Sequence, residues 1–249
     1  MIVRAYKTPK IVIGSDLFQT LDSCVPKLTE KSIVAVTSKI ISICQGRVVK
    51  NDGTAHKREL IRRESQLYME EESSSKWGIV LTVKNDTLIA SSGIDESNGN
   101  GYFVLWPKDI QQAVADIWSH VRATNHLKHV GIIITDSHTT PLRWGVTGIG
   151  IAWCGFEPLK NYIDQPDIFG RLLHVTKASV LDGLAASAVM VMGEGKEQTP
   201  LSVISDVPFV SFTDRPPTSA EMKALHISVT EDIFSPLVNS PRWKKGGQK

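Results

Sequence analysis

The strongest constraint on the fold is an apolar run at residues 129–135, which reads His-Val-Gly-Ile-Ile-Ile-Thr. Its β-branched content makes it the clearest buried strand in the chain. The run ends on Asp136, Ser137 and His138. A carboxylate just past the C-terminal end of a central strand is a favoured place for a metal ligand, because the strand fixes its position while its oxygens stay reachable. An Asx turn that terminates the strand explains the same residues equally well.

A second buried strand is predicted at residues 33–36, and it is followed by two hydroxyls and a cation at Thr37, Ser38 and Lys39. Polar residues directly after a buried strand are where α/β proteins place ligand contacts. A cap between this strand and a following helix is the alternative.

A third polar cluster follows the strand-like run at residues 86–90. Asp95, Ser97 and Asn98 supply carboxylate, hydroxyl and amide groups within four residues, and glycines follow at once. Oxygen ligands on short side chains favour a site for a hard cation or a phosphate. Asp, Ser and Asn are also common turn residues, so an ordinary loop is the alternative.

The remaining periodicities predict an alternation of strands and helices. Strands are expected at residues 2–6, 78–83, 87–90, 201–204 and 209–212. The strands at 78–83 and 87–90 are expected to form a hairpin. Helices are expected at residues 16–21, 57–72, 107–124 and 175–192.

Two features near the predicted helix ends bear on function. The first helix has Ser15 as a possible N-cap. The last helix stops at Gly193, and Glu194 follows beside the negative end of the helix dipole. A carboxylate there is electrostatically unfavourable, and a bound cation or exposure to solvent would offset that cost.

Arg143 and Arg171 are candidate phosphate clamps, although most such arginines form structural ion pairs or are solvated.

Composition excludes several classes of function. The 249 residues are 41% hydrophobic and 22% charged with a net charge of +2, which favours a globular protein and gives no reason to expect nucleic acid as a partner. Three scattered cysteines without a CxxC pair disfavour zinc and disulfides, so we expect a cytoplasmic location. The chain has neither an apolar core of signal-peptide length near its start nor a run long enough to span a membrane.

Taken together, the motifs resemble those of the coenzyme F420-0:γ-glutamyl ligase family over residues 8–207. The order and spacing of these motifs are more specific than any one of them. The resemblance rests on residues 36–42 with Gly46-Arg47, on 93–98, on 131–137, on Arg143 with Gly145, on 167–171 and on 192–195.

The resemblance implies a mixed α/β (α+β) fold without a P-loop, built from two lobes and intertwined in a homodimer. The absence of a GxxxxGK[ST] motif is therefore expected. Residues 1–234 would form this single domain, and residues 235–249 would be a basic, loose tail.

The family's chemistry implies a role for each matching position. Members use GTP and divalent cations to join L-glutamate to a carboxylate acceptor, so the expected partners are GTP or ATP, two Mg²⁺ or Mn²⁺ ions, L-glutamate and the acceptor. Asp95, Asp136 and Glu194 would be catalytic and, with Ser137 in place of a more usual threonine, would hold the two metals. The residues implied to contact the nucleotide are Thr8, Pro9, Lys10, Ile11, Ser38, Lys39, Asn98, Met192, Gly193, Gly195, Lys196, Glu197, Gln198 and Thr199.

Two departures leave the acceptor open. Ile43 stands where the family usually has a nucleotide-contacting lysine, and Gln45 replaces a usual glutamate. If the segment is helical, Lys39 shares a face with Ile43, and its ammonium could cover part of the same space. F420-0 is the favoured acceptor and tetrahydrofolate the alternative; a metal-dependent phosphohydrolase and an inactive nucleotide-binding relative are further alternatives.

Overall fold

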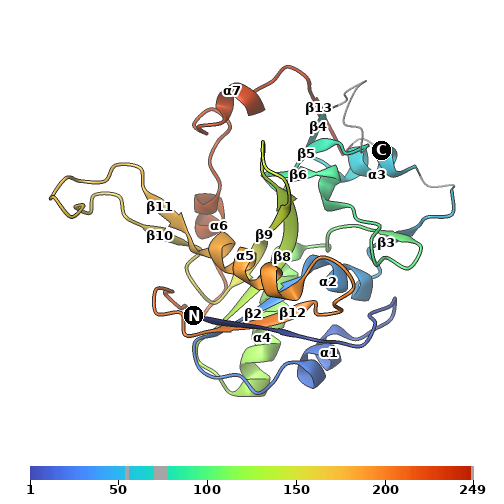
Figure 1. Cartoon of the computed structure of the whole chain (residues 1–249), viewed down its shortest axis with the longest axis horizontal. Coiled ribbons are helices and arrows are strands. Elements are labelled where there is room, and N and C mark those ends of the chain that lie inside the picture. Colours follow the sequence, from blue (N-terminus) through green and yellow to red (C-terminus); the bar gives the residue numbers. More distant parts are fainter. Residues whose placement is uncertain (54–55, 70–77, 248–249) are drawn as a thin grey trace.

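The computed structural model describes residues 1–53, 56–69 and 78–247 of the chain. At its centre lies a five-stranded mixed sheet in the order β1-β12-β2-β8-β9 (Figure 1). Strands β2 and β8 run parallel, and the other neighbours are antiparallel. The five strands are β1 (Ile2–Tyr6), β2 (Ser32–Thr37), β8 (Val130–Thr139), β9 (Val146–Cys154) and β12 (Leu201–Ser205).

Helices cover both faces of this sheet, and each face has its own apolar cluster. On one face the sheet packs against α1 (Leu17–Cys24), α2 (Ser38–Cys44) and α4 (Ile110–Asn125). On the other face it packs against α5 (Val180–Met192). Helix α5 lies very close to β9, because a Cβ atom at Gly150 would overlap the side chain of Leu181.

A second, four-stranded antiparallel sheet lies beside the first, in the order β13-β4-β5-β6. Its apolar cluster is separate from the two on the main sheet and includes Ile61, Ile94 and Phe103. The elements of this part are α3 (Lys57–Glu64), β4 (Leu67–Met69), β5 (Leu81–Lys84), β6 (Thr87–Ala90) and β13 (Trp243–Lys245).

Smaller elements connect and extend these two sheets. A two-stranded arm formed by β10 and β11 projects from the body of the molecule (Figure 1). The smaller elements are β3 (Val48–Lys50), the 3₁₀ helix η1 (Ser91–Gly93), β7 (Tyr102–Val104), β10 (Leu159–Asn161), β11 (Lys177–Ser179), α6 (Ser219–Leu225) and α7 (Ser235–Val238).

The mixed α/β class expected from the sequence is confirmed, together with most of the predicted strands. The strands at residues 2–6, 33–36 and 201–204 are present in the main sheet. The hairpin is present as β5 and β6, joined by a turn in which Asn85 and Asp86 both have positive φ.

Two predicted helices are shorter than expected because each pattern also contains a strand. The helix predicted from residue 175 begins at Val180, since Lys177–Ser179 pairs as β11 with β10. The helix predicted over 57–72 ends at Glu64, since Leu67–Met69 forms β4; residues 70–72 of that prediction lie outside the described residues.

Smaller corrections concern helix starts and one strand. Asp16, not Ser15, caps α1, because its carboxylate accepts hydrogen bonds from the next turn. The helix predicted from residue 107 begins at Ile110. Residues 209–212 form no strand and make only a single bridge, from Phe212 to Phe156.

The C-terminal segment differs from the loose tail that its composition favours. Strand β13 pairs antiparallel with β4, and the N–H of Gly246 donates to the Gln66 carbonyl at 2.9 Å. The division of the chain at residue 234 stays a prediction. Among the described residues there is no helix both long and apolar enough to cross a membrane.

Candidate active site

Asp95 lies in a tight turn after β6 and η1. Its Oδ1 accepts hydrogen bonds from the backbone N–H groups of Glu96 and Ser97, at 2.6 and 2.8 Å. Its Oδ2 forms an ion pair with Lys39 of α2 at 2.6 Å. Burial raises the pKa of Asp95, but the hydrogen bond and charge of Lys39, together with Ser97, lower it by more, so the net pKa lies below its ordinary value. The Asp95 carboxylate is therefore ionised at neutral pH and held in one orientation.

Asp136 and Ser137 lie within β8 and not past its end, which corrects the prediction from sequence. Strand β8 continues to Thr139 because β9 folds back beside it, with Ile149 opposite Asp136 and Gly148 opposite Ser137. The apolar run alone did not predict this extension of β8, because the residues after Thr135 are polar.

The Asp136 carboxylate is hydrogen-bonded at both oxygens. Oδ1 accepts from the backbone N–H of Ser137 at 2.8 Å, and Oδ2 accepts from the indole N–H of Trp106. Burial raises the pKa of Asp136 to about 6, against the hydrogen bonds from Ser137 and Trp106; the charge of Asp95 raises it further and that of Lys39 opposes this. Asp95, Lys39 and Asp136 therefore act on one another electrostatically.

Glu194 follows Gly193, the C-cap of α5, as expected, and is exposed to solvent. The Ser137 hydroxyl donates to its Oε1 at 2.6 Å, which ties the end of α5 to β8. The Asn98 side chain donates to the carbonyl of Gly195 at 2.9 Å, which ties the same loop to the Asp95 turn. Asp95, Ser137 and Glu194 thus lie on three segments that contact one another.

The donor set has the chemistry that a hard divalent cation requires. Asp95, Asp136, Ser137 and Glu194 offer only carboxylate and hydroxyl oxygens, the ligands that Mg²⁺ and Mn²⁺ prefer. Within residues 1–53, 56–69 and 78–247, no three His, Cys, Asp or Glu side chains lie close enough together to hold a metal ion by themselves. Lys39, paired with Asp95, supplies the positive charge beside these carboxylates in the structure.

The structure also joins the segments that the family resemblance assigned to the nucleotide. Thr8 and Gln198 exchange two hydrogen bonds: the Thr8 N–H donates to the Gln198 carbonyl at 3.1 Å, and the Gln198 amide donates to the Thr8 carbonyl at 2.5 Å. The N–H of Thr37, just before Ser38, donates to the Pro200 carbonyl at 3.0 Å. The runs at residues 8–11, 37–39 and 193–199 therefore border the same region as the carboxylates.

Within these runs the side chains differ in what they can reach. The Met192 side chain is buried in the apolar cluster between α5 and the sheet, so it cannot contact a nucleotide. The Met192 carbonyl accepts a hydrogen bond from the Thr199 hydroxyl at 2.5 Å. Glu197 accepts from the N–H of Gly195 at 2.8 Å, while Lys196 is exposed. Pro9 and Lys10 are exposed, and Ile11 packs at the margin of the cluster on the α4 face. The nucleotide-binding role of all these residues stays a prediction.

Two predicted phosphate clamps are not drawn into the site. Arg143 lies in the loop between β8 and β9, and Arg171 lies in the loop between β10 and β11; both are exposed. Ile43 is buried on α2, and Gln45 exchanges hydrogen bonds with the backbone of Lys108. Both departures from the family pattern are therefore accommodated by the fold around α2.

Reasoning from the sequence missed the group that holds Asp136. Trp106 is buried, and beneath its ring lies Lys84, which pairs with Glu64. Arg47 binds the same Glu64 carboxylate. Lys84 stands in a predicted turn and Trp106 stands before a predicted helix, so neither position carries a pattern that predicts a role at the site. Two family motifs include neighbours of these groups: Arg47 of Gly46-Arg47, and Gly93 at the start of residues 93–98.

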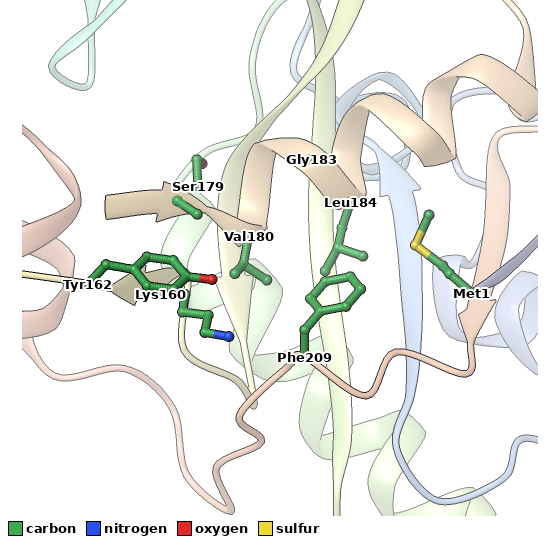
Figure 2. Close-up of a pocket in the computed structure, with 9 residues that line it drawn as sticks. Met1, Lys160, Tyr162, Ser179, Val180, Gly183, Leu184 and Phe209 are labelled. Carbon is green, nitrogen blue, oxygen red and sulfur yellow. The ribbon is translucent and has the colours of Figure 1, made fainter. Parts of the chain in front are cut away.

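A cavity of about 270 Å³ lies elsewhere, between the base of the β10–β11 arm, α5 and the chain near Phe209 (Figure 2). Lys160, Tyr162 and Leu184 are among its lining residues, and none of the residues predicted to bind metal or nucleotide lines it. Hydrogen-bond geometry and the clustering of charged groups identify the site better than this open apolar cavity does.

Comparisons with known proteins show which sequences this chain is similar to. The model of the family described as F420-0:Gamma-glutamyl ligase matches residues 5–206. Coenzyme F420:L-glutamate ligase of Methanococcus maripaludis strain C7 is 30% identical over 220 residues, which cover 83% of this chain and 86% of that protein. The ligase of the same name from Methanosarcina barkeri is 30% identical over 79% of this chain and 81% of its own length. That of Methanopyrus kandleri is 28% identical over 90% and 93%.

Proposed function

The chain belongs to the F420-0:gamma-glutamyl ligase family, and from this we propose that it uses a nucleoside triphosphate and divalent cations to join L-glutamate to the carboxylate of coenzyme F420-0. The observation that carries the proposal is the contact between segments remote in sequence. Lys39 with Asp95, Asn98 with Gly195, and Ser137 with Glu194 tie together three segments that carry oxygen ligands.

Amide formation requires that the acceptor carboxylate be activated first, because a carboxylate is a poor electrophile. In the proposed reaction a carboxylate oxygen of the acceptor attacks the γ-phosphorus of the nucleotide, the bond to the β-phosphate oxygen breaks, and an acyl phosphate forms. The amine of L-glutamate then attacks the acyl carbon, phosphate leaves, and the ammonium proton is released. The net reaction yields the amide, the nucleoside diphosphate and inorganic phosphate.

The cations would be held by Asp95, Asp136, Ser137 and Glu194, where they would neutralise charge on the phosphates and align donor with acceptor. The chain's own groups have distinct tasks. The turn at Asp95 and the hydrogen bonds at Asp136 fix the carboxylates before substrates bind, so little reorganisation is needed during the reaction.

Lys39 places a cation beside the proposed ligand Asp95. Its ammonium pairs with Asp95 at 2.6 Å and also donates to the carbonyl of Ser97 at 2.9 Å. If Asp95 held a divalent cation, the Lys39 ammonium would be free to bind a phosphate oxygen of the nucleotide. GTP is the proposed nucleotide, and ATP is its competitor in the test below.

We also propose that the active form is a homodimer. Several large apolar side chains on the projecting loops are almost fully exposed: Ile168 at 92% and Phe169 at 89% on the arm, and Trp144 at 94% beside β9. Exposed apolar groups of this size mark surfaces that another protein covers. Light scattering after gel filtration should give twice the 27.4 kDa mass of one chain, and a monomer at micromolar concentration would contradict the dimer.

The function is tested with purified protein, labelled L-glutamate, GTP or ATP, Mg²⁺ or Mn²⁺, and either F420-0 or tetrahydrofolate. We expect label in F420-0 with GTP. Label in tetrahydrofolate alone would identify the folate acceptor instead. Phosphate release without label would indicate a phosphohydrolase, and nucleotide binding without any product would indicate an inactive relative.

A pair of matched variants shows whether the assay reports on this site. Asp95→Asn removes a proposed ligand charge, and we expect glutamate incorporation to fall by about 100-fold or more. Asp116→Asn makes the same change at an exposed position of α4 and should leave incorporation unchanged. Equal activity in both variants would remove Asp95 from the mechanism.

A further inference from the structure

Trp106 is a buried side chain that contacts a proposed metal ligand through its only polar atom. The residue is 2% exposed and follows β7. Its indole N–H donates to Oδ2 of Asp136, while Oδ1 of Asp136 accepts from the N–H of Ser137 at 2.8 Å. With one donor on each oxygen, the plane of the Asp136 carboxylate is fixed.

Three contacts hold Trp106 in place, two at its ring and one at its backbone. The ammonium of Lys84 lies 5.5 Å from the ring centroid, over its face. Gly93 lies against its edge, since a Cβ atom there would overlap the indole nitrogen. The carbonyl of Trp106 accepts from the guanidinium of Arg47 at 3.2 Å. These contacts restrict the orientation of the indole, so its N–H stays directed at the Asp136 carboxylate.

A buried ion cluster keeps Lys84 beneath the ring. Oε2 of Glu64 accepts from Lys84 at 3.0 Å and from Arg47 at 2.7 Å. Lys84 is only 8% exposed, and a cation over an indole face is stabilised by the ring's quadrupole. The two cations that bind Oε2 of Glu64 thus also contact Trp106, Lys84 at the ring and Arg47 at the backbone carbonyl.

We propose that Trp106 is a positioning residue for Asp136, and that the cluster of Arg47, Glu64 and Lys84 serves to hold it there. The indole N–H takes up one lone pair of Oδ2 and sets the carboxylate so that its remaining lone pairs are available to a divalent cation. This inference rests on the proposed function, because it assigns Asp136 to the cation site. A hydrogen-bonded partner behind a ligand of this kind typically contributes 10–100-fold to metal affinity.

The test compares two identical substitutions. Trp106→Phe keeps an aromatic ring but removes the N–H donor. Trp118→Phe is the matched control, because Trp118 is also buried, donates its indole N–H to the Val130 carbonyl at 2.9 Å and lies under a cation, Arg122, at 4.9 Å. Each variant loses one buried hydrogen bond and the same volume, so a merely structural role would affect both alike.

The readout is Mn²⁺ binding to the purified protein, followed by the electron paramagnetic resonance signal of free Mn²⁺, with no nucleotide and no turnover. We expect Trp106→Phe to bind Mn²⁺ about 10–100-fold more weakly than the wild type, and Trp118→Phe to bind within about twofold of it. Equal affinity in wild type and Trp106→Phe would overturn the positioning role while leaving the ligase proposal intact. A wild type that binds no Mn²⁺ would overturn both.

A second pair of variants moves the indole without deleting it. Gly93→Ala places a methyl group where the indole nitrogen lies, at a backbone φ of +68°. Gly46→Ala imposes the same φ of +68° with no atom within 4 Å of the new methyl group. We expect weaker Mn²⁺ binding for Gly93→Ala only; equal affinities would contradict the proposal, even if Trp106→Phe does not fold.

Discussion

Replacing Glu64 by Gln tests the buried ion cluster most directly. The carboxylate lies 3.0 Å from the Lys84 ammonium and 2.7 Å from the Arg47 guanidinium, and its side chain is 12% exposed. The variant leaves the Lys84 ammonium buried without its ion-pair partner. Removing one partner of a buried pair costs about 3–5 kcal/mol. Because the Arg47 side chain is 31% exposed and can be hydrated, we expect a loss near the lower end, about 3 kcal/mol.

This loss is measured by thermal and urea unfolding of wild type and variant. For a domain of this size, 1 kcal/mol corresponds to about 2–4 °C in Tm, so the variant should melt about 6–12 °C lower. Burial raises the pKa of Glu64, but Lys84 and Arg47 lower it by more, so its net pKa lies below the ordinary value of 4.5. The stability that ionised Glu64 contributes is therefore fully present above pH 4.5 and is lost as the pH falls through its lowered folded-state pKa. The difference between the two proteins should be constant near neutrality and shrink in acid.

An exposed pair provides the control. Lys57 and Glu96 lie closer together, at 2.6 Å, but their side chains are 35% and 47% exposed. Glu96→Gln should cost less than about 1 kcal/mol, since water screens the pair. The reasoning fails if Glu64→Gln costs no more than Glu96→Gln, or if the difference between wild type and Glu64→Gln grows toward acid pH. A double variant that also carries Lys84→Met should recover part of the loss, because the unpaired ammonium is gone.

Three further predictions follow from single contacts. Lys39→Ala should weaken GTP binding in the presence of Mg²⁺ by about tenfold or more in calorimetry, as expected for a lost charged hydrogen bond, and an unchanged affinity would remove Lys39 from the nucleotide site. Gly150→Ala should lower the free energy of unfolding by about 1–3 kcal/mol, because the methyl group overlaps a side chain of α5, whereas Gly183→Ala, with no neighbour within 4 Å, should be neutral or stabilising in urea titrations. Truncation before Ser240 removes β13, so amide hydrogen exchange should accelerate in β4 but not in β2; uniform exchange in both would show that β13 does not stabilise its sheet.

Four strands of the main sheet were predicted, and the clearest of them, at residues 33–36 and 129–135, are rich in β-branched residues. The fifth strand, β9 (Val146–Cys154), was not predicted. The bounds of two helices were not predicted correctly, because a short strand precedes α5 and another follows α3. Lys177–Ser179 lies next to α5 in sequence, yet it pairs with β10, a partner that local periodicity cannot reveal. The same reason explains β4 and β13, each only three residues long.

The contacts that join the segments of Ser137, Asn98 and Glu194 agree with the prediction that these segments lie together, whereas the groups behind Asp136 were not predicted. Asp95 lies in a turn after a strand and Glu194 lies just past a helix end, while Asp136 ends an apolar run although its strand continues to Thr139, and all three belong to motifs of the family resemblance. Trp106 and Lys84 contact the site only through tertiary packing, and in the sequence they resemble an ordinary core aromatic and a turn lysine. A reading of one sequence identifies groups that end elements better than groups that lie behind them.

Asp136 and Asp95 are carried by different sheets, and this makes the spacing of these two carboxylates a property of the interface between the sheets. Asp136 lies on β8 of the main sheet, while Asp95 follows β6 of the second sheet and bridges to Val104 of β7. Between them, Trp106 spans the interface, bonded to Asp136 on one side and packed over Lys84 of the second sheet on the other. Apolar packing alone would let the two sheets shift by small amounts at little cost, whereas a directed indole bond would not. Weakening the buried ion cluster should therefore change the proposed cation site before it unfolds the main sheet.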